Sequence, residues 1–539
     1  MRFPSSVLPT LSSFLPLLLL LALPQNPALA QSRGVELSEV VRFRDVEIAP
    51  NEVLPLESGF ALYTYQTLQA GRMQFAGVGR NPNRLDEVTE LVLHRFDDDL
   101  RALGEAPLSW YGPRDLLSVF SLGESVVWAY ATATDEKNRY AIHAATYSPE
   151  GEPLDDYRLM DLDRRDYGGL QVYAGESASR DYHVRVFAEQ SGQRLLSKRD
   201  DERATMTVAV FAADGQLVTH VTEELAVARD QLDVQSVSVD DEGNAYVAAR
   251  VFTNSKGRET MGGSDSDVFV YDVPRGGATL ARTRLDLAGQ YIATLEFYPV
   301  PDGPPTVLGL YTERRGDRLR GVFATNDPTG GQTLEPQRFS DELLTSLGPR
   351  VTAGKGDRLR LEGDFEFLDS QILPDGSLAV LLEDYRESYF VDPNTGRQRV
   401  TFQYAEGIVI TFDPTGRLYE AWVVPKFQSE VNQISPFVRM KLIPYGDGVG
   451  VLYNDSPKNL ARTLDERTKP LRFRDAVAVI GYIDNGELQR RPLFGRKEAD
   501  KLLMAPSSGV RLANGDVVFV AKRFKMFGRN ELRFGLVEG

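Results

Sequence analysis

FEFLDSQILPDGSLAVLLEDY (Phe365–Tyr385) and YAEGIVITFDPTGRLYEAWVVP (Tyr404–Pro425) are the stretches that decide the fold of this chain. Each holds two short apolar runs around a turn sequence, Pro374–Gly376 in the first and Asp413–Gly416 in the second. Proline presets φ and glycine accepts positive φ, so both sequences favour tight turns between paired strands. We therefore predict two β-hairpins in series, joined by a long polar loop over Asp384–Glu406.

The four strands of these hairpins are predicted at Gln371–Leu373, Ser377–Leu382, Ile408–Phe412 and Leu418–Val424. They are apolar at nearly every position instead of at alternate positions. In an antiparallel sheet this pattern indicates that both faces of the sheet are covered. Sheets stacked face to face around a common axis meet that requirement, so the stretch is predicted to be one blade of a β-propeller.

The same two-hairpin unit recurs along the chain, and a fixed repeat of this kind decides a fold. Further first hairpins are predicted at Leu54–Tyr65, Leu116–Ala131, Leu170–Ala188, Val237–Val251, Leu295–Tyr311, Met440–Asn454 and Gly509–Arg523. Further second hairpins are predicted at Leu91–Leu103, Ala141–Leu159, Met206–Val221, Val268–Leu285, Gly321–Phe339 and Ala476–Phe494. The two kinds alternate throughout.

The last repeat has only Leu532–Val537 as its third strand. A strand-like segment at Val40–Ile48 precedes the first repeat. A ring of sheets must close to remove its exposed edges, so this segment is predicted to pair with the last blade. The prediction is an all-β protein, an eight-bladed propeller of four-stranded blades. Seven blades are the alternative, if a weak unit such as the one around Gly321 is an insertion.

The N-terminus has the features of an export signal. Arg2 precedes an apolar run over Leu15–Leu23, and Ala28-Leu29-Ala30 stands before Gln31 as a cleavage sequence. The run is too short to span a bilayer, so we expect cleavage and no remaining transmembrane segment. Residues 1–30 are predicted to be a signal peptide and 31–539 one propeller domain. The expected location is the periplasm, the outer cell surface or the exterior.

Composition excludes several classes of protein. The chain has no cysteine, which excludes disulfides, thiolate catalysis and cysteine-bound metals. The net charge of −16 argues against broad nucleic-acid binding, which needs a basic face. All four histidines fall inside predicted strands, where a structural role is expected: His94, His143, His183 and His220. We predict no cofactor and no metal, and we expect a monomer.

The propeller topology predicts which face carries a binding site. The turns inside each hairpin are short, whereas long segments such as Gln190–Thr205 and Asp455–Asp475 join the first hairpin to the second. All of these longer segments emerge on one face of the ring, and loops on a rigid scaffold commonly carry binding sites. The residues predicted to bind a ligand or partner there are Tyr385, Arg386, Tyr389, Asn454, Asp455, Lys458, Asn459, Lys522 and Arg523.

The C-terminal part of the chain, over about Tyr404–Gly539, resembles a group of exported, uncharacterised propeller-like proteins common in Bacteroidota. The resemblance is carried by Lys426-Phe427-Gln428, by Tyr453-Asn454-Asp455 and by Lys458-Asn459-Leu460. It implies export and a β fold. It implies no activity and no catalytic residues.

Three functions are compatible with the sequence. The first is a non-enzymatic binding or scaffold propeller with a protein or glycan partner in the cell envelope, acting through the loop-rich face. The second is a secreted hydrolase or lyase acting on a polysaccharide or peptide through carboxylates near the axis. Buried, convergent carboxylates at the top of the channel would favour it, and an aromatic, arginine-rich rim would favour binding. The third is a subunit of a cell-envelope complex.

Overall fold

A computed structural model of the chain describes residues 35–38, 41–43, 47–67, 87–108, 110, 114–136, 138–189, 202–253, 266–313, 318–346, 351–353, 359–361, 365–391, 398–414, 416–432, 435–446, 448–462, 468–484, 486–495, 502–523 and 530–537. The predicted signal peptide lies outside these residues, as do most of the predicted long segment Gln190–Thr205 and a part of Asp455–Asp475.

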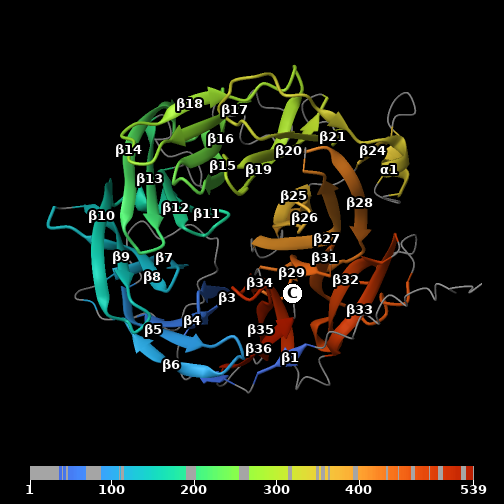
Figure 1. The fold of residues 1–539 in the computed structure, drawn as a ribbon, viewed down its shortest axis with the longest axis horizontal. Coiled ribbons are helices and arrows are strands. Elements are labelled where there is room, and N and C mark those ends of the chain that lie inside the picture. Colours follow the sequence, from blue (N-terminus) through green and yellow to red (C-terminus); the bar gives the residue numbers. More distant parts are fainter. Residues whose placement is uncertain are drawn as a thin grey trace, which may run out of the picture. The chain divides into compact units, whose positions relative to one another are not determined.

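The chain folds into the predicted all-β, eight-bladed propeller, and Figure 1 follows its sheets in chain order from blue to red. Blades 1 and 2 consist of β3 (Glu47–Leu56), β4 (Gly59–Thr67), β5 (Glu87–Phe96), β6 (Ala102–Pro107), β7 (Arg114–Leu122), β8 (Ser125–Ala133), β9 (Arg139–Tyr147) and β10 (Pro153–Asp163). Blades 3 and 4 consist of β11 (Leu170–Glu176), β12 (Tyr182–Glu189), β13 (Arg203–Ala212), β14 (Leu217–Ala228), β15 (Leu232–Val239), β16 (Ala245–Phe252), β17 (Ser266–Val273) and β18 (Ala281–Arg284).

Blades 5 and 6 consist of β19 (Tyr291–Tyr298), β20 (Thr306–Thr312), β21 (Gly321–Thr325), β22 (Gln337–Arg338), β25 (Phe365–Ile372), β26 (Leu378–Val391), β27 (Gln398–Phe412) and β28 (Leu418–Val424). Between them lie α1 (Asp341–Ser346), β23 (Val351–Ala353) and β24 (Leu359–Leu361). Blades 7 and 8 consist of β30 (Met440–Tyr445), β31 (Gly448–Asp455), β32 (Val477–Asp484), β33 (Glu487–Gly495), β34 (Leu502–Arg511), β35 (Val517–Arg523) and β36 (Asn530–Val537).

The predicted turns of blade 6 form as expected. Gly376 has φ +83° and Gly416 has φ +80°, values that favour glycine. The Asp375 and Asp413 carboxylates accept backbone N–H groups at 2.9 and 3.0 Å, which completes each turn. The strands around these turns run antiparallel in the order β25-β26-β27-β28.

The core is distributed between neighbouring blades. The buried apolar side chains of the described residues form eight clusters, each shared by two successive blades. One of these clusters joins blade 8 to blade 1, where Phe534 of β36 meets Phe60 and Phe96 at ring-centroid distances of 4.8 and 4.5 Å. Strands β3 and β34 also pack together there, which Figure 1 shows as blue beside red. The repeat around Gly321 is a blade and not an insertion.

Two short N-terminal strands, β1 (Glu36–Leu37) and β2 (Val41–Phe43), pair antiparallel with β36. The Ser38 hydroxyl accepts the Phe534 N–H at 2.9 Å, and the Ser38 N–H donates to the Phe534 carbonyl at 2.9 Å. These strands occupy the outer edge of β36, where the sequence placed the missing fourth strand. That their pairing closes the ring remains a prediction.

The prediction of a polar loop over Asp384–Glu406 was wrong. Strands β26 and β27 continue through it as a ladder from Tyr385↔Tyr404 to Val391↔Gln398. A further strand, β29 (Gln428–Val431), pairs with β27 from Tyr404↔Gln428 to Thr401↔Val431. The sequence is polar because this ladder projects beyond the core and both of its faces meet solvent over much of its length. Its cross-strand pairs include Tyr385↔Tyr404 and Tyr389↔Val400, and aromatic and β-branched residues favour strands.

We call this three-stranded projection the β-extension. It comprises Tyr385–Val391 of β26, Gln398–Tyr404 of β27 and all of β29. Within the described part of the chain, no helix has the length and apolar character needed to cross a bilayer.

Candidate functional site

Two of the three sequence motifs that carry the family resemblance meet at the base of the β-extension. Lys426 and Gln428 follow blade 6, and Asn454 and Asp455 end the second strand of blade 7. The Gln428 side-chain amide donates to the Asn454 carbonyl at 2.7 Å, which joins the motifs directly. Because these residues follow second and fourth strands, they lie on the loop-rich face, as predicted.

Lys426 and Glu383 form an ion pair at the centre of this region. Both side chains have 0% solvent exposure, and the lysine Nζ contacts Glu383 Oε1. Lys426 Nζ also donates to Gln428 Oε1 at 3.0 Å, and that oxygen accepts the Arg439 N–H at 3.1 Å. Burial lowers the pKa of Lys426, and the Glu383 carboxylate partly offsets this effect.

Asn454 ties blade 7 to blade 8. Its side-chain amide donates to the Phe437 carbonyl at 2.8 Å and to the Met504 carbonyl of β34 at 2.7 Å. The side chain is fully buried. The Asn454 amide nitrogen therefore satisfies two carbonyls inside the protein.

Asp455 and Asn459 form a second buried pair beside it. Asp455 Oδ1 accepts the Ser456 N–H at 2.7 Å and the Asn459 Nδ2 at 2.7 Å. The Asn459 side chain also bonds both backbone groups of Lys469, at 2.8 and 2.9 Å. This network ties the residues that follow β31 to Lys469, and both residues, which were predicted to bind a ligand or partner, have buried side chains.

Burial raises the pKa of Asp455 to about 6. An aspartate in the unfolded chain titrates near 3.9, so the folded state binds the proton more tightly. The contribution of Asp455 to the free energy of unfolding is therefore expected to fall as pH rises from about 4 to about 6. The expected fall is roughly 2–3 kcal/mol, because a shift of one pKa unit corresponds to about 1.36 kcal/mol.

Asp455→Asn is expected to remove that dependence. The amide keeps Oδ1 as the acceptor for Ser456 and Asn459, and it carries no charge to desolvate. Urea denaturation at pH 4 and pH 7 measures the effect. The variant should have a higher free energy of unfolding than the wild type at pH 7 and the same free energy of unfolding at pH 4. A larger loss at pH 7 than at pH 4 would contradict the assignment.

The three predicted residues of the β-extension are at or near its surface. The Tyr385 hydroxyl donates to Glu387 Oε1 at 2.5 Å, and the Tyr389 hydroxyl donates to the other oxygen of the same carboxylate. Arg386 pairs with Asp384 through bonds of 3.1 and 3.2 Å. The Tyr389 side chain is 57% exposed, which leaves its ring available to a partner.

The remaining predicted residues are not brought together with these. Lys458 is exposed on the segment after β31. Lys522 lies near the end of β35, where burial lowers its pKa. Arg523 ends β35, and its side chain lies outside what the structure describes.

Sequence reasoning missed three residues of the region, namely Glu383, Tyr404 and Arg439. The Arg439 guanidinium lies 5.2 Å from the Tyr385 ring centroid and 5.4 Å from that of Tyr404, within cation–π range. One signal was present: Lys426 interrupts an apolar run, and a buried lysine needs a carboxylate partner. The identity of that carboxylate depends on the pairing of β26 with β27. The sequence predicted a loop for part of these two strands.

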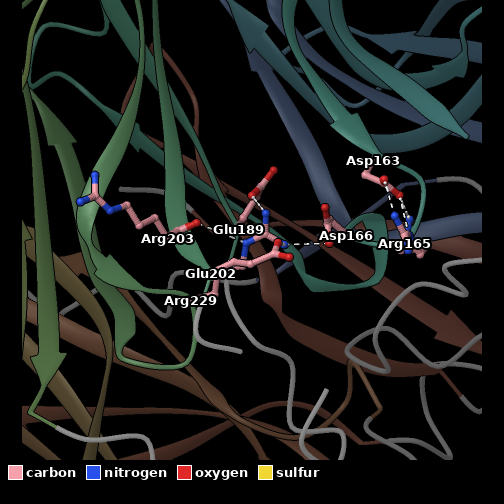
Figure 2. Close-up of polar contacts among 7 residues, drawn as sticks. All are labelled: Asp163, Arg165, Asp166, Glu189, Glu202, Arg203 and Arg229. Atoms are coloured by element: carbon pink, nitrogen blue, oxygen red, sulfur yellow. Dashed lines mark hydrogen bonds and ion pairs between the residues drawn. The ribbon is translucent and has the colours of Figure 1, made fainter. Parts of the chain in front are cut away.

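Figure 2 shows another ionic network, at blade 3. Glu189 ends the second strand of this blade and Arg229 follows its fourth strand, which places the network on the loop-rich face. The Arg229 guanidinium contacts Asp166 at 2.7 Å, Glu189 at 2.6 Å and Glu202 at 3.7 Å, and its Nε donates to the Arg203 carbonyl at 3.4 Å. Arg229 follows β14, Asp166 precedes β11, and Glu189 ends β12. The network therefore links the segments that join blade 2 to blade 3 and blade 3 to blade 4 with the end of the second strand of blade 3.

Among the described residues, no group of three or more histidine, aspartate or glutamate side chains is placed to hold a metal ion. The four histidines lie in β5, β9, β12 and β14, as expected, with partners such as Thr64 at 2.9 Å from His94. Lys426, Glu383 and Asp455 have no exposed surface of consequence, so a large substrate does not reach them in this conformation.

Comparison with known proteins assigns no family to this chain. The chain matches no protein-family profile and no curated protein. Among solved structures, it is similar to a mutant of Synechocystis apocarotenoid oxygenase, with 11% identity, a TM-score of 0.32, and 74% of this chain and 96% of that chain covered. It is also similar to a protein of unknown function from Bacteroides caccae, with 12% identity, a TM-score of 0.26, and 65% and 92% covered.

Proposed function

We propose that this protein is an exported, non-enzymatic binding propeller that captures a polypeptide partner on its β-extension. The observation that carries the proposal is an open strand edge with exposed aromatic side chains. Strand β25 pairs with β26 only as far as Asp384, so Tyr385–Val391 has β27 on one side and no described strand on the other. Free N–H and C=O groups of such an edge can pair with an extended peptide.

The side chains along this edge suit recognition of a protein. Tyr389, Phe390 and Val391 are 57%, 58% and 60% exposed, and Val431 of β29 is 45% exposed. Neighbours in a strand point to opposite faces, so Tyr389 and Phe390 offer one aromatic ring on each face of the projection. Exposed aromatics beside Arg386 have the composition of interface centres.

The base of the β-extension holds this edge in place. Gln428 of β29 is bonded to both Lys426 and Asn454, and Tyr404 of β27 is fully buried. A binding surface on a rigid support loses less conformational entropy on association than a free loop does. We assign the buried ionic residues to this supporting role.

The cellular setting of the proposal rests on the N-terminal signal and on the family resemblance. Residues 1–30 have the order of a cleaved export signal, and the matched motifs are those of exported propeller-like proteins. We propose membership of that group and a partner in the cell envelope. A scaffold subunit of an envelope complex would use the same edge.

The experiment is affinity capture from the envelope extract of the source cells, with mass spectrometry of the retained proteins. Tyr389→Ala with Phe390→Ala removes both exposed rings, and Tyr419→Ala is the matched control because Tyr419 is 80% exposed on β28, outside the β-extension. We expect a protein retained by the wild type and the control and lost from the double variant.

Retention of the same protein by all three chains would overturn the assignment of the edge. Retention of no protein, together with turnover of a polysaccharide or peptide by the wild type, would replace the proposal with the hydrolase or lyase alternative.

A further inference from the structure

A cavity lies where the first strands of several blades converge, away from the β-extension. Its volume is about 200 Å³. Its walls come from β3, β25, β30, β34 and the start of β35, and from the turn between β11 and β12, which contributes Arg180. Arg180 and Arg511 both lie at the short-turn ends of their hairpins, so the cavity is placed toward the face opposite the long loops.

Cationic side chains dominate this cavity. Three of its lining residues carry positive charge, Arg180, Lys441 and Arg511, and one carries negative charge, Asp369. Lys441 Nζ contacts Asp369 Oδ1 at 3.1 Å, and Asp369 Oδ2 accepts the Leu442 N–H at 2.7 Å. The Asp369 charge is therefore already matched by groups of blade 7.

The two arginines are less completely neutralised. Arg180 Nε lies 3.2 Å from Glu176 Oε1, and Arg180 Nη2 donates to the Arg511 carbonyl at 3.3 Å. The Arg511 guanidinium makes no ion pair or hydrogen bond with any residue that the structure describes. The cavity thus keeps a net positive charge in a chain whose net charge is −16.

The backbone holds Arg180 in a position that an arginine rarely adopts. Its φ is +64°, in the left-handed region. The turn is fixed by the Arg180 N–H donating to the Ser177 carbonyl at 3.1 Å and by the Ser179 N–H donating to Asp241 Oδ1 at 2.8 Å. Such strained residues concentrate at ligand clamps, because the surrounding structure must keep them in place.

We propose that this axial cavity binds a small ligand through a carboxylate or phosphate group, with Arg511 and Arg180 as the donors. A guanidinium presents a planar fork of N–H groups that matches both kinds of oxyanion. The Gln371 and Ser370 side chains, also in the wall, supply neutral polar groups for the rest of the ligand. The site is independent of the β-extension and of the partner proposed for it.

Isothermal titration calorimetry of the purified mature protein at low ionic strength tests the proposal, with inorganic phosphate in one arm and succinate in the other. We expect one-to-one binding of at least one of the two, weakened by added salt because the charges are partly exposed. Arg511→Gln should weaken it by about 10-fold or more, the scale of one lost charge-assisted hydrogen bond.

Two further variants keep the test decisive. Arg474→Gln is the matched control, since Arg474 is exposed and lies away from the cavity wall. Arg180→Gly suits the left-handed backbone, so it should keep the melting temperature while weakening the same binding. Binding of neither anion by the wild type would overturn the proposal. So would binding that Arg511→Gln and Arg180→Gly both leave unchanged.

Discussion

Lys426→Met is expected to lower the free energy of unfolding by about 3–5 kcal/mol, because it leaves the Glu383 carboxylate buried without its counter-charge. Both side chains have 0% exposure, so solvent does not screen the loss. The cost combines the desolvation of one carboxylate with the loss of the Lys426 bond to Gln428. Urea denaturation followed by tryptophan fluorescence measures it, since Trp422 lies in β28 of the same blade.

A double replacement distinguishes the effect of the buried charges from the effect of the volume that the two side chains fill. Lys426→Met with Glu383→Leu removes both charges together, and similar replacements of buried ion pairs are often neutral or stabilising. We expect the double variant to recover most of the loss. The matched control is Arg139→Ala, which breaks the exposed pair with Glu136 and should change stability by less than about 1 kcal/mol. Equal effects of Lys426→Met and Arg139→Ala would show that the buried pair is not a supporting element.

Repetition made the propeller predictable from the sequence. The blades repeat similar turn residues between apolar runs, such as Asp375–Gly376 and Asp413–Gly416 in blade 6. Hairpins can be predicted from such local signals without knowledge of the tertiary structure. The position of the candidate region on the loop-rich face followed from strand order alone. The matched motifs at Lys426–Gln428 and Tyr453–Asn459 were also the ones that the fold brings together.

The β-extension and the axial cavity could not be predicted in the same way. Tyr385–Val391 mixes charged and aromatic residues and lacks the continuous apolar run of the other strands, a pattern that is also typical of a loop. Only its ladder with β27 shows that it is a strand. Asn454 bonds a carbonyl of blade 8, and Asn459, the partner of Asp455, bonds the backbone of Lys469. Neither contact can be derived from the local sequence. Arg180 and Arg511 are 331 positions apart and meet only through the ring.

Phe534→Ala is expected to cost about 3–5 kcal/mol, the usual range for removing a fully buried phenylalanine. Phe534 is one of the residues through which the last blade packs on the first. Its ring meets Phe60 and Phe96 edge-on, at 4.8 and 4.5 Å, and all three side chains are buried. Such aromatic contacts add to the stabilisation from buried area. Phe390→Ala is the control, since that ring is 58% exposed and should change stability by no more than about 0.5 kcal/mol.

The same measurement distinguishes the two ways of joining the ends of the ring. A chain that begins at Glu47 lacks β1 and β2 but keeps the aromatic contacts of Phe534. If pairing with β36 closes the ring, this chain should also lose stability, and Phe534→Ala should cost more within it than in the full chain. Residues that share one interface are coupled in this way. If the truncated chain unfolds at the urea concentration of the wild type, packing alone holds the last blade to the first, and the predicted role of the N-terminal strand is wrong.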